Sequence, residues 1–128
     1  MMKPHLQHCM LGNDDHDRAH THVFDCVAEI ASLDRNQQPH ADQVHHLRLV
    51  LDEHFRYEND HLAQIKCPKY AAHVRDHARL LDHLDKIMQQ KEIGTSLAYS
   101  VTVLENMFAD HISYYDRAMV VHERQLTQ

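Results

Sequence analysis

Residues 54–77 read HFRYENDHLAQIKCPKYAAHVRDH, and this segment predicts two helices that meet at one end. His54 and Glu58 are four residues apart, a spacing that places two side chains on the same face of an α-helix. His73 and His77 have the same spacing after a Cys-Pro break. Helices joined by so short a link pack as antiparallel neighbours. All four side chains are therefore expected at the same end of a helical hairpin.

The rest of the chain extends this hairpin to four helices. Apolar residues recur at three- and four-residue intervals over four stretches. With only 2 Gly and 3 Pro there is little material for many turns. We therefore predict an all-α, up-down-up-down antiparallel four-helix bundle, a single domain over residues 1–128 with an N-terminal arm over residues 1–12. The helices are expected from an N-cap near Asn13 to Leu33, from Ala41 to before Cys67, from Pro68 in the first turn to a break at Gly94, and from Leu97 past Met119.

Composition narrows the class of protein. The net charge of −6 argues against nucleic acid or an anionic membrane as the main partner. Three cysteines far apart in the sequence form no disulfide framework, and no apolar stretch reaches the ~20 residues of a membrane span. A soluble cytoplasmic protein is expected. The 15 histidines are the unusual feature, because neutral imidazoles are available as metal ligands.

The hairpin is expected to supply half of a dinuclear metal site. In an antiparallel bundle, the starts of the first and third helices lie at the same end as the finishes of the second and fourth. His20 lies early in the first predicted helix, and His111 and Asp116 lie late in the last. Being five apart, His111 and Asp116 would diverge by about 140° on a regular helix, so Asp116 is expected to reach between two metals instead of sharing one ion with its partner. The candidate ligands are His20, His54, Glu58, His73, His77, His111 and Asp116, a set that suits iron but also zinc, manganese or cobalt.

The order of these residues resembles the hemerythrin family. The matching pattern is His20, His54-Phe55-x-x-Glu58, His73-x-x-x-His77 and His111-Ile112-x-x-x-Asp116. It runs from about Asp14 to Met119, although Asn59 stands where the family has a second glutamate. The resemblance implies two iron ions bridged by Glu58, Asp116 and an oxo or hydroxo group. It also implies that His73, His77 and His111 complete one iron, while His20 and His54 leave the other iron an open position.

The function that the resemblance implies is reversible binding of O2 for storage, delivery or scavenging, with no enzymatic turnover. Five imidazoles donate less charge than the carboxylate-rich sites of di-iron oxidases, which favours reversible chemistry. Two alternatives stay open. One is a di-iron enzyme, such as a peroxidase, oxidase or nitric oxide reductase, and the other is a sensor of O2 or redox state acting through a separate protein.

Not every histidine is expected to bind the metal. Among 15 histidines roughly one or two H-x-x-x-H pairs arise by chance. His16 forms such a pair with His20 and is expected to face solvent. Cys26 is interpreted as a small core residue, and Cys67 as a thiol in the second link. The histidines that match no motif and are expected mostly at the surface are His5, His8, His22, His40, His45, His46, His61, His83 and His122.

Overall fold

The computed structural model describes residues 9–89 and 97–127, and within these ranges it contains helices and no strands. The prediction of an all-α protein is confirmed. The last helical stretch is interrupted by a short π-helix, η2, which the sequence did not indicate. The elements are α1 (Asp14–Arg35), α2 (Ala41–Gln64), α3 (Tyr70–Gln89), α4 (Leu97–His111), η2 (Ile112–Asp116) and α5 (Arg117–Leu126).

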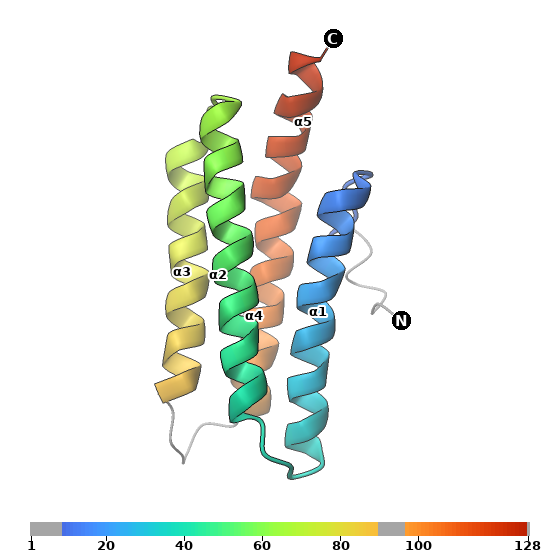
Figure 1. Cartoon of the computed structure of the whole chain (residues 1–128), viewed down its shortest axis with the longest axis vertical. Coiled ribbons are helices and arrows are strands. Elements are labelled where there is room, and N and C mark those ends of the chain that lie inside the picture. Colours follow the sequence, from blue (N-terminus) through green and yellow to red (C-terminus); the bar gives the residue numbers. More distant parts are fainter. Residues whose placement is uncertain (1–8, 90–96, 128) are drawn as a thin grey trace.

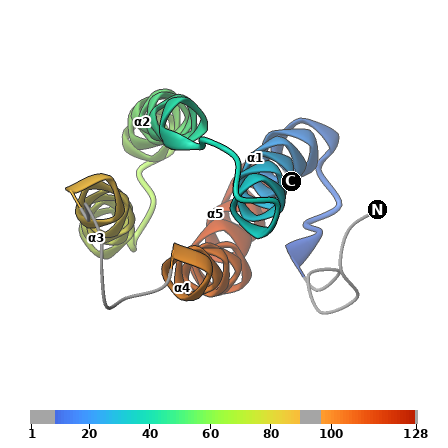
Figure 2. The same cartoon turned by 90° about the horizontal axis from the view of Figure 1, so that it is seen from below.

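The helices lie side by side as a bundle (Figure 1). Both α1 and α3 pack mainly against α2 and α4, which gives the four-column arrangement seen end-on in Figure 2. The segments α4, η2 and α5 follow one another in a single column, coloured orange to red in Figure 1. Among the described residues, no helix has both the length and the apolar character needed to cross a membrane.

An apolar stripe on each helix forms the core. In α2 the residues Val44, Leu47, Leu51 and Phe55 recur at three- and four-residue intervals, and each is at most 4% exposed. Full burial of a Leu or Phe side chain stabilises a fold by about 1.5–3 kcal/mol, so this stripe anchors α2 firmly. The other helices contribute further fully buried side chains: Ile30, Leu80, Leu84, Leu104, Phe108, Ile112 and Met119.

Side-chain hydrogen bonds fix the start of α1. The Oδ1 of Asn13 accepts a backbone N–H of the first turn at 3.1 Å, so the predicted N-cap is confirmed. Asp17 is buried and accepts the backbone N–H groups of Leu11 at 2.8 Å and Gly12 at 3.2 Å. Gly12 has a φ of 76°, which favours glycine. These contacts tie the preceding segment to α1 one turn before His20.

The link between α2 and α3 differs in detail from the sequence prediction. Because α3 begins at Tyr70, Pro68 lies in the preceding turn and not in the first turn of the helix. The chain reverses at Lys66, whose φ is 53°, and the Tyr70 N–H then donates to the carbonyl oxygen of Cys67 at 3.1 Å. This turn delays the start of the helix. The predicted break at Gly94 falls outside the described residues.

Candidate metal centre

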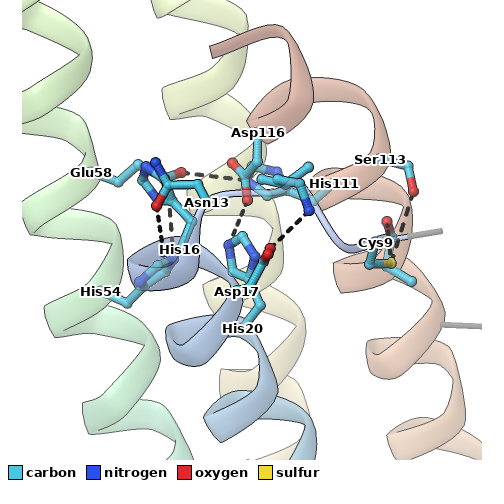
Figure 3. A network of polar contacts seen from close by, with 12 residues as sticks. Cys9, Asn13, His16, Asp17, His20, His54, Glu58, His111, Ser113 and Asp116 are labelled. Carbon is cyan, nitrogen blue, oxygen red and sulfur yellow. Dashed lines mark hydrogen bonds and ion pairs between the residues drawn. The ribbon is translucent and has the colours of Figure 1, made fainter. Parts of the chain in front are cut away.

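The seven side chains singled out in the sequence come together inside the bundle. Figure 3 shows Glu58, Asp116, His20 and His54 gathered in the space between their helices. Six of the seven residues are at most 2% exposed, and the seventh, His54, has a side chain that is 12% exposed. Their role as metal ligands stays a prediction. The contributors are His20 from α1, His54 and Glu58 from α2, His73 and His77 from α3, His111 from α4 and Asp116 from η2.

Three histidines and two carboxylate oxygens form one side of the cluster, called here the three-histidine side. His73 Nε2 lies 2.9 Å from Glu58 Oε1 and 2.8 Å from Asp116 Oδ1. His77 Nε2 lies 2.8 Å from the same Glu58 oxygen. His111 Nε2 lies 3.1 Å from the same Asp116 oxygen. Each residue offers one ligand atom, all within 4.8 Å of one another, so the group could hold a metal ion.

The remaining oxygen of each carboxylate faces a second group, the two-histidine side. His54 Nε2 lies 3.3 Å from Glu58 Oε2, and His20 Nε2 lies 3.0 Å from Asp116 Oδ2. The rings of His20 and His54 are 5.5 Å apart and nearly perpendicular. His20, His54 and Glu58 also offer ligand atoms within 4.8 Å of one another. Each carboxylate therefore spans the two groups, with one oxygen turned to each.

Several buried polar atoms of the cluster lack a hydrogen bond, and this supports a bound cation. Among the described residues, His20 Nε2, His54 Nε2, Glu58 Oε2 and Asp116 Oδ2 have no hydrogen-bond partner, although they lie close together. His111 Nε2 is in the same situation. A buried polar atom left in this state costs about 1–3 kcal/mol. Metal ions between the nitrogens and carboxylate oxygens would satisfy these atoms, so the residues present fit a metal centre.

The π-helix η2 changes the expected relation between His111 and Asp116. The backbone N–H of Arg117 donates to the carbonyl oxygen of Ile112, five residues earlier, in place of the usual four. The wider turn brings residues five apart onto one face, and His111 Nε2 lies 3.1 Å from Asp116 Oδ1. The expectation that the two side chains diverge was wrong, because it assumed a regular helix. Asp116 nevertheless also reaches His20 with its other oxygen.

Two residues outside the predicted ligand set orient its imidazoles. His77 Nδ1 donates to Asn59 Oδ1 at 2.7 Å, and His111 Nδ1 donates to Asp76 Oδ2 at 2.7 Å. Asp76 in turn accepts a hydrogen bond from Arg79 Nε at 2.8 Å. Committing Nδ1–H to an acceptor leaves Nε2 with its lone pair for a metal. The sequence offered one signal for Asp76, since it lies three residues after His73 and therefore near the same helix face.

The charges of the cluster suit cations. Burial raises the pKa of Glu58, but the four neighbouring histidines, His111 foremost, outweigh it and hold this pKa well below its ordinary value. Burial and the charge of Glu58 raise the pKa of Asp116. His111 and His20 lower it by more, so the pKa of Asp116 lies well below its ordinary value. Burial lowers the pKa of His111, but the charge of Asp116, followed by the hydrogen bond with Asp76, outweighs it and raises this pKa well above the ordinary value. Both carboxylates are therefore anionic in the interior, where a charge requires a partner.

Aromatic rings close the cluster on one side, and a pocket approaches it on another. Phe55 stacks on His77 with ring centroids 4.1 Å apart, and Phe108 meets His20 edge-on at 5.7 Å. The pocket has a volume of about 200 Å³ and reaches His54. Phe55 thus shields His77 on the three-histidine side, whereas a small molecule can approach His54 on the two-histidine side.

The lining of this pocket corrects one prediction. His16 was expected to face solvent, but it is half-buried and lines the pocket. Its ring stacks 6.3 Å from the ring of His20, and His61 lies 6.4 Å away on its other flank. His61 Nε2 also lies 2.5 Å from Glu123 Oε2 at the pocket wall. Helical spacing alone could not predict that His16 lines a pocket, because another lining residue, Glu123, comes from the far end of the chain.

Comparisons with known proteins do not extend this description. No protein-family model matches the chain, and neither the curated proteins nor the solved structures contain a match. The family suggested by the order of histidines and carboxylates therefore stays a prediction. The geometry of the buried cluster is the feature of the chain that indicates a function.

Proposed function

We propose that this chain is a hemerythrin-like protein that binds O2 reversibly at a pair of iron ions. The observation that carries the proposal is the spanning arrangement of Glu58 and Asp116, each with one oxygen toward three histidines and one toward two. Carboxylates on facing helices are the ligands that bundle-borne di-iron sites use to hold two adjacent ions. An up-down-up-down antiparallel course belongs to the proposal, and the alternating direction of the sequence colours in Figure 1 supports it.

Each side of the cluster would hold one ion. Glu58 and Asp116 would each contribute one carboxylate oxygen to each side. When bound, a pair of ferrous ions supplies the reversible electron transfer that oxygen binding requires. The two-histidine side has one imidazole fewer and borders the pocket at His54, so it is the side at which O2 is expected. The ligands would be His73, His77 and His111 for one ion and His20 and His54 for the other.

The surrounding residues would favour reversibility over turnover. Phe55 lies against His77 and Phe108 against His20, and both aromatic side chains are at most 2% exposed, so they would keep water from these two imidazoles. Excluding water slows the proton-dependent side reactions that would consume bound oxygen. Asn59 and Asp76 hold His77 and His111 in fixed orientations and so limit rearrangement of the ligands.

Metal analysis combined with an optical spectrum tests the proposal. Chain loaded with Fe²⁺ without oxygen should contain about two iron ions per chain, as bundle-borne di-iron sites do. Admitting O2 should produce a visible absorption band that disappears when O2 is removed, over repeated cycles. The metal-free chain treated in the same way serves as the control. One iron per chain, or a band that does not reverse, would overturn the proposal.

A di-iron enzyme is the second candidate, and the pocket favours it. The imidazoles of His16 and His61 and the carboxyl group of Glu123 line the approach to His54 and could exchange protons with a small substrate. Steady consumption of hydrogen peroxide or nitric oxide by the iron-loaded chain, at many turnovers per iron, would support the enzyme. Stoichiometric, reversible uptake of O2 without turnover would exclude it.

A further inference from the structure

A second group of metal-ligating side chains lies away from the buried cluster. His22 and Cys26 are four residues apart on α1, and His46 comes from the neighbouring helix α2. Each offers one ligand atom, and the three atoms lie within 4.8 Å of one another. The two imidazoles are exposed, whereas Cys26 is 9% exposed and takes part in no disulfide. The sequence interpretation separated these residues into surface histidines and a core cysteine.

The chemistry of the three groups determines which ion they suit. A thiolate and two imidazoles form a ligand set typical of Zn²⁺, which binds four ligands and accepts water as the fourth. The four-residue spacing places His22 and Cys26 on one helix face, so α1 presents both without rearrangement. We propose that His22, Cys26 and His46 form a second metal site, for a divalent ion of the zinc type, that joins α1 to α2.

The charges around Cys26 suit a cation. Burial, and then the carboxylates of Glu29 and Asp25, raise the pKa of the Cys26 thiol, so the sulfur carries its proton in the absence of metal. A divalent ion displaces that proton to solvent when it takes the sulfur as a ligand. The same two carboxylates are exposed and add a negative potential that attracts the ion.

Sulfur distinguishes this site from the buried cluster. The buried cluster offers nitrogen and oxygen ligands from histidine, glutamate and aspartate only. An ion that has a sulfur ligand together with imidazoles therefore reports the site at Cys26. The inference does not depend on the proposed oxygen chemistry, because the two sites share no residue.

Zinc titration of the iron-loaded chain tests the inference. The chain should take up one further Zn²⁺, and X-ray absorption at the zinc edge should show one sulfur at about 2.3 Å and nitrogens at about 2.0–2.1 Å. Cys26→Ser should remove the sulfur signal. Changing an outer partner of a ligand already lowers metal affinity about tenfold to hundredfold, so His46→Ala, which removes a ligand itself, should weaken zinc binding by about tenfold or more. His45→Ala changes an exposed neighbour on the same helix and should leave zinc binding unchanged.

Each variant is compared at equal iron content and equal helical circular dichroism, which separates loss of the site from loss of the fold. His46 is exposed, so His46→Ala tests the site even if Cys26→Ser disturbs the core. A zinc spectrum without sulfur in the unmodified chain would overturn the inference. The same holds if His45→Ala weakens binding as much as His46→Ala. If the buried cluster fails to load iron, the sulfur signal still separates zinc at Cys26 from zinc bound among the buried histidines.

Discussion

The two sides of the buried cluster differ in how firmly the chain holds their ligands. On the three-histidine side, Asn59 and Asp76 accept hydrogen bonds from two of the three imidazoles. On the two-histidine side, neither ring nitrogen of His20 has a hydrogen-bond partner among the described residues. His54 on that side is also the most exposed of the seven candidate ligands and borders the pocket. One side is oriented before any ion arrives, and the other is left adjustable.

This difference suits a site in which one ion is structural and the other meets a small molecule. Imidazoles that are already oriented by Asn59 and Asp76 lose less conformational freedom when they bind an ion. An ion on the three-histidine side is therefore expected to bind more tightly than one on the two-histidine side. An ion with fewer protein ligands keeps a position for an incoming molecule. The comparison therefore predicts that changes on the two sides will have unequal effects, whereas a change to a shared carboxylate will affect both.

The largest effect is expected from Glu58→Gln. Glu58 is the carboxylate on which His54, His73 and His77 converge, and an amide neither carries its charge nor bridges two ions. Iron content measured after loading and gel filtration should fall from about two ions per chain to nearly none. Glu53→Gln changes an exposed glutamate on the same helix and should keep full iron content. Retention of both ions by Glu58→Gln would refute the shared-carboxylate arrangement.

Removing one imidazole from each side compares the sides directly. His54→Ala should leave about one iron per chain, because the three-histidine side keeps all its ligands. His111→Ala should lose more, since His111 also meets Asp116 and is held by Asp76. Iron content and the oxygen-dependent absorption band are the measurements. Equal iron content in the two variants would show that the sides do not differ.

A smaller effect is expected when an outer partner is changed. Asp76→Asn removes the charge that orients His111, and such changes lower metal affinity about tenfold to hundredfold. Iron affinity can be measured by competition with a chelator. Asp82→Asn is the matched control, since Asp82 is an exposed carboxylate on α3 that also pairs with a cation, Lys86. Equal iron affinities in Asp76→Asn and Asp82→Asn would show that the hydrogen bond from His111 to Asp76 does not strengthen metal binding on the three-histidine side.

Much of this arrangement could be predicted from sequence, because helical spacing fixes which residues share a face. The pairs His54/Glu58 and His73/His77 required only the four-residue period. His20 was found by asking which part of the bundle lies beside them. Asn13 showed the start of α1 through the ordinary preference for asparagine at an N-cap.

The rest depended on contacts that spacing does not encode. The π-helix before Asp116 cannot be read from a regular period, so the approach of Asp116 to His111 was missed. Asp76 meets His111 across two helices, a contact between residues 35 positions apart. The rotation of each helix about its own axis also decides that His22, Cys26 and His46 meet between α1 and α2. Such contacts follow from packing and not from local pattern.

The smallest predicted effect is the pH dependence of stability, which is expected to have opposite signs in the metal-free and the metal-loaded chain. Without metal, burial lowers the pKa values of His73 and His54, but contacts with Glu58 and Asp116 outweigh burial, so both pKa values are raised. The pKa of His111 is raised well above its ordinary value. A raised pKa stabilises the fold below the unfolded value of about 6.5, and this contribution is lost as pH rises through the folded values. Burial lowers the pKa values of His77 and His16, so these two groups oppose the trend.

Stability of the metal-free chain should therefore fall as pH rises above about 6.5, whereas the loaded chain should gain stability there, since metal binds neutral imidazole and is displaced by protons. Urea unfolding of both forms between about pH 6 and 8 measures the two slopes. His111→Ala should flatten the metal-free slope, because it removes the group whose pKa is raised most strongly. Slopes of the same sign in both forms would mean that protons and metal do not compete for these imidazoles. That result would contradict a metal centre at either side of the cluster, because a ligand nitrogen cannot hold a proton and an ion together.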